Sequence, residues 1–107
     1  MSTMLVSEPL AIDLQKIRKA SLHFRAINNN FRLQILQLIH QHQQLNVTDI
    51  YVKLRADQSK TSVHLSILRK ANVVYAQREG KSIFYSINYE HLKHLHVMAD
   101  GILNNVD

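Results

Sequence analysis

The residues best suited to chemistry lie in one short stretch, QSKTSVHLSILRK, from Gln58 to Lys70. Its first half is crowded with side chains that donate or accept hydrogen bonds: Gln58, Ser59, Lys60, Ser62 and His64. Val63 is an apolar residue among these polar side chains, and no acidic residue follows Asp57 in the stretch. Because a solvated helix face usually mixes Glu with Lys, this composition indicates a partner that is negatively charged and rich in hydrogen-bonding groups.

Histidines form a second group with chemical potential, since the chain has seven of them. His91 and His94 are spaced i, i+3, and His96 and Asp100 are spaced i, i+4. Two imidazoles and a carboxylate on one helix face, doubled across a dimer, can bind zinc or nickel. The alternative is that these histidines lie partly exposed beside a dimer seam. We expect no bound metal, and His91 and His94 are the candidate ligands if one is present.

The composition argues against several functional classes. The chain has no cysteine, so it has no disulfides, thiolate metal sites or thiol redox sensors. Two glycines make a phosphate-cradling loop hard to build, and no paired carboxylates stand at a useful spacing, so we expect neither an enzyme nor a cofactor. No apolar run approaches the roughly 20 residues that span a bilayer, and the N-terminus does not read as a secretory signal. A cytoplasmic protein is expected.

Length and charge point to one basic domain. The 107 residues include 46% hydrophobic residues, and Lys and Arg exceed Asp and Glu by 13 to 8, which gives a net charge of +5. A basic domain of this size often meets nucleic acid, although many small soluble domains are basic for solubility. We expect a flexible N-terminus over residues 1–9 and a single domain over residues 10–107.

Helical periodicity accounts for the first half of the chain. The first helix carries a stripe at helical spacing: Leu10, Leu14, Ile17, Ser21 and Phe24. A second helix is expected from Phe31 to about His40, capped from the Asn28–Asn30 run, and it is apolar nearly all round, which is typical of a central buried helix. After a polar loop over residues 41–45, Asn46 caps a short third helix.

A fourth helix follows the tight connection Arg55-Ala56. Asp57 is its expected N-cap, and the carboxylate suits the positive end of the helix dipole. Asn72 ends the helix, because Asn tolerates the left-handed backbone of a helix C-terminus. The inner side follows i, i+4, i+7 and i+10: Thr61, Leu65, Leu68 and Ala71.

The residue pattern then changes to that of strands. Residues 73–78 and 82–88 are rich in β-branched and aromatic side chains, and Glu79-Gly80 supplies the turn of a hairpin. Arg78 and Lys81 lie at its tip. Residues 89–105 are helical again, with an apolar stripe of Leu92, Leu95, Ala99 and Ile102.

This order predicts a mainly α protein with a small β-hairpin, α-α-α-α-β-β-α, which is a winged helix-turn-helix. In a helix-turn-helix, two helices are joined by a tight turn, and the second helix lies in the DNA major groove with its first residues at the base edges. Gln58 can pair with adenine, Ser59 and Ser62 can serve bases or phosphates, Lys60 can reach guanine or phosphate, and Val63 can touch a thymine methyl.

Four further residues complete the expected DNA-binding set. His64 either bonds a phosphate or braces the helix. Arg69 is included from the same helix, and Arg78 and Lys81 would sit against the backbone or in the minor groove.

Three segments resemble the ArsR-type (arsenical-resistance repressor) winged helix-turn-helix regulators. Arg32–Leu36 (RLQIL) is similar to the family's R-L-x-I-L, Gln58–Ala71 to its recognition helix, and Arg78–Tyr85 (REGKSIFY) to its wing. The resemblance covers about Leu22 to Asn105. It implies a homodimeric repressor that binds an inverted repeat and releases it on a signal.

The chain departs from that family at its usual metal sites. Asn46–Ile50 (NVTDI) stands where soft-metal sensors carry Cys-Val-Cys-Asp-Leu. Tyr89 stands where the zinc-binding members have the Asp of Asp-x-His, so only His91 of that site remains, and residues 102–105 hold no ligand. Arg55 also replaces a Gly that is common in the turn. The effector cannot be read from the sequence.

The apolar stripes of the first and last helices predict a homodimer, because a three-helix core cannot cover both. A two-fold dimer sets its recognition helices one DNA turn apart, about 34 Å. The alternative function is a winged-helix protein-interaction module without specific DNA binding. Acidic or large apolar residues on the recognition face would favour that alternative, and the sequence has neither.

Overall fold

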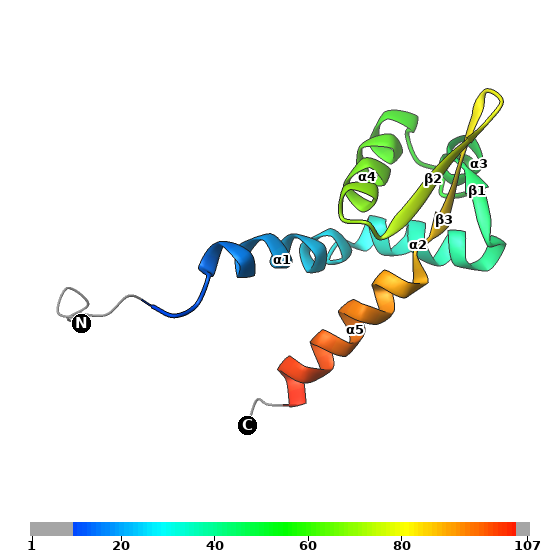
Figure 1. The fold of residues 1–107 in the computed structure, drawn as a ribbon. Helices are drawn as coiled ribbons and strands as arrows, with labels where there is room; N and C mark the ends of the chain where they lie inside the picture. The colour runs from blue at the N-terminus through cyan, green and yellow to red at the C-terminus, as the bar shows by residue number, and fades with distance from the viewer. Residues whose placement is uncertain (1–9, 105–107) are drawn as a thin grey trace.

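The computed structural model describes residues 10–104 as five helices and three strands around one hydrophobic core (Figure 1). In chain order these are α1 (Leu14–Ile27), α2 (Asn30–His42), β1 (Gln44–Asn46), α3 (Val47–Lys53), α4 (Gln58–Lys70), β2 (Val74–Glu79), β3 (Ser82–Ile87) and α5 (Tyr89–Asn104). The expected winged helix-turn-helix architecture is confirmed. The expected flexible N-terminus, residues 1–9, and Asn105 at the end of the last predicted helix lie outside the described residues.

Side-chain caps fix where the helices begin. Asn46 accepts a hydrogen bond from the backbone N–H of Asp49 at 2.8 Å, and Asp57 accepts one from Lys60 at 3.2 Å, as predicted. Asp13 caps α1 in the same way, so α1 begins at Leu14 and the prediction of a start near Leu10 was wrong.

The expectation that α2 is buried nearly all round was also wrong. Ile35, Leu36 and Ile39 are buried, whereas Leu33 is 40% exposed. The glutamines at 34 and 37 are exposed as well. The helix therefore turns one face to the core and the other to solvent, as an amphipathic surface helix does.

The sheet has one strand more than the predicted hairpin. β1 pairs antiparallel with β3, giving the order β1-β3-β2. Three residues are too few to show the alternation that marks a strand, so residues 41–45 looked like a loop. Glu79 pairs with Ser82, which makes Gly80 and Lys81 the two loop residues in place of the expected Glu79-Gly80.

Left-handed backbone marks four corners of the chain. Gly80 has φ 64°, and Asn72 has φ 63° just after Ala71, the C-cap of α4, both as expected. Arg55, in the turn between α3 and α4, has φ 53°, and Gln43 has φ 72° at the end of α2. A non-glycine side chain in this region costs about 1–2 kcal/mol, less for Asn, so these corners are held by the packing on either side.

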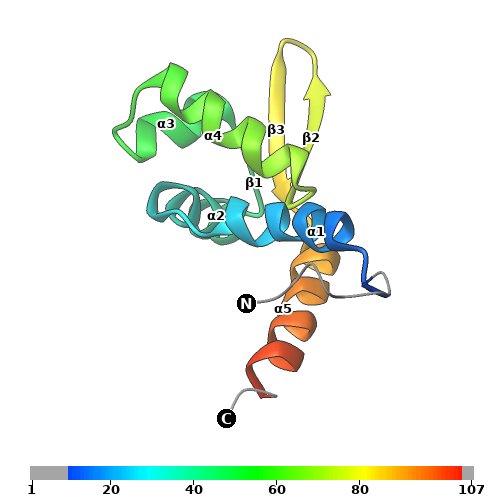
Figure 2. The ribbon, with the colours of Figure 1, turned by 90° about the vertical axis from the view of Figure 1, so that its left-hand side faces the viewer.

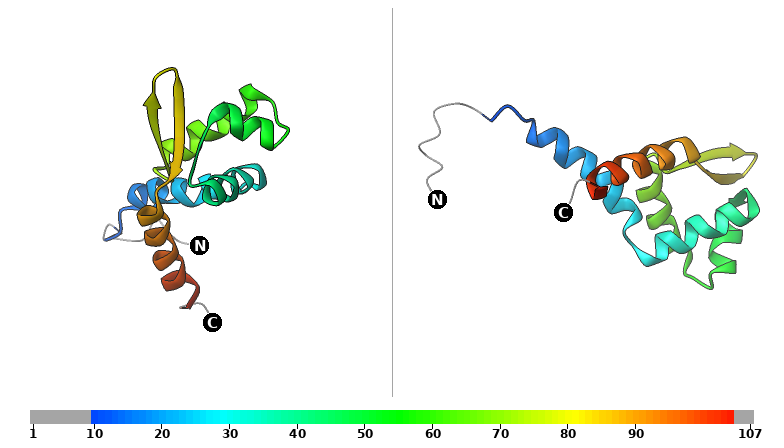
Figure 3. Two further views of the ribbon diagram at one scale, coloured as in Figure 1. Left: turned by 90° about the vertical axis from the view of Figure 1, so that its right-hand side faces the viewer. Right: turned by 90° about the horizontal axis from the view of Figure 1, so that it is seen from below.

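The core supports the recognition helix from below. The inner residues of α4 are all buried, as predicted: Thr61, Leu65, Leu68 and Ala71. They pack with buried residues of α2, α3 and the sheet. Figures 2 and 3 show that α4 and the hairpin project to one side of the molecule, while α5 runs away on the opposite side. α1 extends sideways from the body (Figure 1).

Candidate nucleic-acid interface

The start of α4 is presented to solvent and is not folded against the body. All five residues predicted to read DNA there are exposed: Gln58, Ser59, Lys60, Ser62 and Val63. Val63 is an apolar side chain with 59% of its surface exposed, which is unusual enough to suggest a contact surface. The Asp57 carboxylate just before them is engaged in the helix cap.

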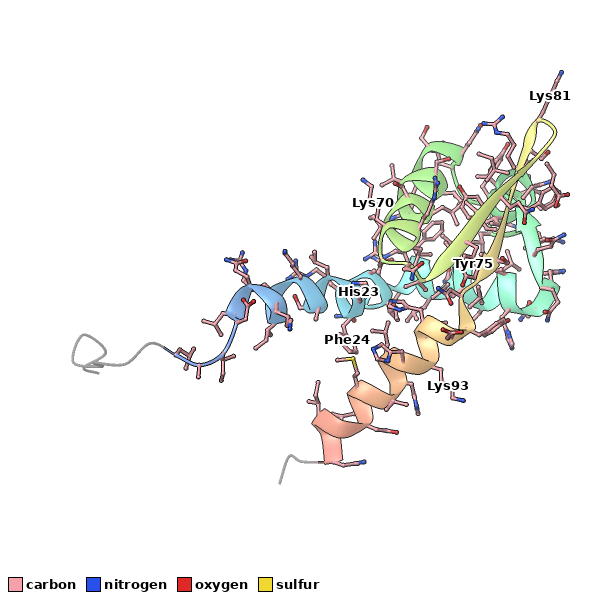
Figure 4. The ribbon with its side chains drawn as sticks, in the orientation of Figure 1. His23, Phe24, Lys70, Tyr75, Lys81 and Lys93 are labelled. Carbon is pink, nitrogen blue, oxygen red and sulfur yellow. The ribbon has the colours of Figure 1, made fainter. Side chains whose placement is uncertain are left out.

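The basic residues of the predicted interface are all exposed to solvent. Arg78 and Lys81 are exposed at the hairpin end, and Figure 4 shows Lys81 pointing away from the body. Arg69 is exposed in the last turn of α4. Within residues 10–104, the ion pair found within 4.0 Å joins His96 and Asp100 on α5, at 3.8 Å. These cations are therefore free of carboxylate partners.

Phe31, at the start of α2, forms a platform under two of the predicted DNA-binding side chains. The ammonium of Lys60 lies 4.4 Å from the centre of its ring, a cation–π contact worth about 0.5–1 kcal/mol at an exposed site. The His64 ring meets the same ring edge-on, with centroids 5.0 Å apart. Both side chains are thus held in place before any partner binds.

Arg32 joins α1, α2 and α4 through one buried guanidinium. Its Nε donates to the Ala26 carbonyl at 2.6 Å, and Nη2 donates to the Arg25 carbonyl at 3.3 Å. Nη1 lies 3.0 Å from Nδ1 of His64. Because Arg only donates, His64 must accept and so is neutral, with its proton on Nε2. We name this set of contacts the Arg32 latch.

Of the two roles expected for His64, its contacts in the structure fit bracing of the helix. Burial, followed by the charges of Arg32 and Lys60, holds the pKa of His64 below its ordinary value of 6.5. A role against phosphate stays a prediction, and in this structure the side chain already contacts Arg32 and the ring of Phe31.

Stability is expected to fall as pH drops below about 6.5. The lowered pKa of His64 means that the unfolded chain takes up a proton in this range before the folded chain does, so acid favours unfolding. In His64→Gln, the fall in Tm between about pH 7.5 and pH 5, followed by circular dichroism at fixed ionic strength, should be smaller. It should not vanish, because the pKa of His91 is lowered as well. An unchanged slope would contradict a neutral His64.

The two candidate metal ligands, His91 and His94, differ in their surroundings. His91 Nε2 lies 2.9 Å from Nδ1 of His23 on α1, and that Nδ1 is also 2.9 Å from the Ala71 carbonyl. A carbonyl can only accept, so His23 donates from Nδ1. Burial, His23 and His94 lower the pKa of His91, against an opposing effect of the Ala71 carbonyl. His94 is exposed.

These histidines link helices. The His23–His91 contact ties α1 to α5 at the end of α4. In the described part of the chain, no three or more His, Cys, Asp or Glu side chains come together in a group that could hold a metal ion.

Sequence reasoning missed three residues that organise the site: Phe31, Arg32 and His23. Arg32 did carry a signal, since a cation inside an apolar run is buried only if it is fully hydrogen-bonded. Phe31 and His23 carried no such signal, because their partners are far away along the chain.

No helix within residues 10–104 combines the length and the hydropathy that crossing a membrane requires.

The chain matches the model of the bacterial regulatory protein arsR family over residues 30–76. It is 34% identical to an uncharacterized HTH-type transcriptional regulator of Methanocaldococcus jannaschii, over 83% of this chain and 100% of the relative. It is 32% identical to the arsenical resistance operon repressor of Bacillus subtilis, over 74% of this chain and 75% of that protein.

Solved structures agree on the fold. A homodimeric winged helix-turn-helix DNA-binding domain from Mycobacterium bovis superimposes with a TM-score of 0.70 at 23% identity, over 92% of this chain and 91% of that one. The matched segment, residues 30–76, contains Arg32 and His64 of the latch, α3 and the whole of α4. The chain therefore belongs to the arsR family of bacterial transcriptional regulators.

Proposed function

We propose that this protein represses transcription in the cytoplasm by binding an inverted-repeat operator as a homodimer. The observation that carries the proposal is the start of α4: five uncharged or basic side chains are exposed together, beside a basic hairpin. Such an element fits the major groove, where its side chains reach the base edges while the hairpin follows the backbone. The protein acts by binding and not by catalysis.

Dimerisation through α1 and α5 is supported by the apolar residues that these helices leave in solvent. Apart from Leu22, which lies on another face of α1, the large hydrophobic residues exposed on them are Leu14, Ile17, Tyr89, Val97, Met98, Ile102 and Leu103. Exposed apolar side chains in this number, on two helices that extend from the body, are typical of an unfilled interface. A two-fold axis there would point both α4 helices to one side, about 34 Å apart.

The proposed contacts divide into positioning and reading. Arg69, Arg78 and Lys81 would neutralise phosphates. Gln58 and Ser62 would read bases by hydrogen bonds, with Val63 against a thymine methyl. Ser59 and Lys60 stand between the two roles, and Lys60 would leave the ring of Phe31 to reach DNA.

Two double variants separate these roles on a duplex selected from a random pool. Arg78→Gln with Lys81→Gln should weaken binding to every sequence and reduce the slope of log K against log salt by about 2, because two phosphate contacts are lost. Gln58→Ala with Ser62→Ala should weaken binding to the selected duplex by about 10-fold or more and leave binding to random duplexes unchanged. Fluorescence anisotropy measures both.

Lys93→Gln is the matched control, since Lys93 is an exposed cation on α5, away from the hairpin (Figure 4). It should bind like the unmodified protein. Equal affinity of the unmodified protein for selected and random duplexes would overturn the proposal and favour a protein-interaction module.

A further inference from the structure

A groove of about 500 Å³ runs between α1 and the end of α4, away from the proposed DNA-reading residues. Its walls are Lys19, Leu22, His23, Arg25 and Ala26 from α1, Arg32 from α2, and Ile67, Lys70 and Ala71 from α4 and its end. Figure 4 shows Lys70 on α4 and His23 on α1, the two helices that flank the groove. The volume falls within the range of about 300–1,000 Å³ that small-molecule sites occupy.

The lining of this groove has an apolar part and a basic part. Leu22, Ala26, Ile67 and Ala71 supply apolar surface, and Leu22 is 54% exposed although it is a large aliphatic side chain. Lys19, Arg25 and Lys70 are exposed at the rim. Among residues 10–104, no Asp or Glu lines the groove. A ligand that satisfies both parts must combine a negative charge with a hydrocarbon body.

The groove does not coincide with either of the proposed interfaces. Lys19, Leu22 and Ala26 follow i, i+3 and i+7 and so share one face of α1. The apolar stripe of α1 proposed for the dimer includes Leu14 and Ile17. It also follows helical spacing, but it starts from different positions than Lys19, Leu22 and Ala26, so it lies on another face of the helix. On α4, Ile67 and Lys70 lie in the last turn, about three turns from Gln58, and Arg69 in that turn lies on another side of the helix because successive residues are about 100° apart.

We propose that this groove binds a small organic anion with an apolar body, such as a carboxylate on a hydrocarbon chain or ring. The carboxylate lies among Lys19, Arg25 and Lys70, and the hydrocarbon covers Leu22 and Ile67. Because the ligand touches both α1 and α4, its binding changes how the recognition helix is held against α1. This effect on operator affinity rests on the function proposed above, whereas the binding itself does not.

Binding is tested by calorimetric titration of the full chain with octanoate, using octanol and inorganic phosphate as probes that each lack one of the two features. Octanoate should bind saturably and raise Tm, and the other two should not at the same concentration. Lys19→Gln with Lys70→Gln should weaken octanoate binding at least about 10-fold, since both rim charges are lost. Lys93→Gln should leave it unchanged.

Several outcomes would overturn the site. Octanol binding as well as octanoate would mean an apolar surface only, and phosphate binding as well would mean a simple anion site. Absence of octanoate binding would end the proposal outright. Dissociation of the dimer in Leu22→Asn, seen by sedimentation, would mean that a second copy of the chain covers the groove.

A DNA measurement keeps this proposal separate from the first. Lys19→Gln with Lys70→Gln should bind the selected duplex with unchanged affinity, because neither residue belongs to the proposed DNA-binding set. Octanoate should shift the affinity of the unmodified protein and leave that of the double variant unchanged. Octanoate binding without any effect on DNA would retain the site and remove its regulatory role.

Discussion

Replacement of Arg32 by methionine is expected to lower the free energy of unfolding by about 3 kcal/mol. Arg32 is only 9% exposed and makes the three contacts of the latch, at 2.6, 3.3 and 3.0 Å. Methionine fills part of the space but removes the donor to the Ala26 carbonyl and to Nδ1 of His64, whereas the Arg25 carbonyl keeps the Asn28 N–H. A loss of this size corresponds to a fall in Tm of roughly 12–24 °C in a domain of about 100 residues.

Arg18→Met is the control for this experiment, because Arg18 is exposed on α1. Its effect should stay within about 0.5 kcal/mol. Urea unfolding followed by circular dichroism measures both variants. If Arg32→Met proves as stable as the unmodified protein, the latch does not hold α1 to the body.

The second large effect is expected at the proposed dimer seam, in Ile17→Glu with Ile102→Glu. These two side chains are 56% and 59% exposed in the single chain. Burying a carboxylate without a partner at either place is strongly unfavourable, so the dimer should weaken by at least about 100-fold. Operator affinity should fall about as much, because a monomer reaches only one half-site.

Sedimentation measures the oligomeric state of this variant directly. The unmodified protein should run at about twice the chain mass of 12.4 kDa, and the double variant at the chain mass. Val52→Glu makes the same change on α3, at a residue that is also exposed, and should stay dimeric. A monomeric unmodified protein at micromolar concentration would refute the seam and the inverted-repeat geometry together.

Much of the fold could be predicted because its signals are local. Asp57, Asn46 and Asn72 act within three or four residues of themselves, and each ends or begins a helix as predicted. The inner residues of α4 follow from periodicity alone. β1 could not be predicted in this way, since its three residues are held by β3, some 40 positions later in the chain.

The exposed residues of the site could be predicted from the sequence, but the residues that support them could not. The exposed residues at the start of α4 were found because they break the ordinary composition of a solvated face. The supports beneath them were not found: Phe31 under Lys60, and Arg32 against His64, join residues about 30 positions apart. Such pairs depend on how α2 and α4 pack, and no spacing rule encodes that packing.

The left-handed corners at Gln43, Arg55 and Asn72 affect the denatured chain as well as the native one. Glycine at these places would relieve about 1 kcal/mol or more of native strain at each of the first two. It would also give the denatured ensemble more freedom, which costs roughly 0.4–1 kcal/mol per position on folding. The two effects nearly cancel, so a chain with two glycines can turn its sharp corners with little net loss of stability.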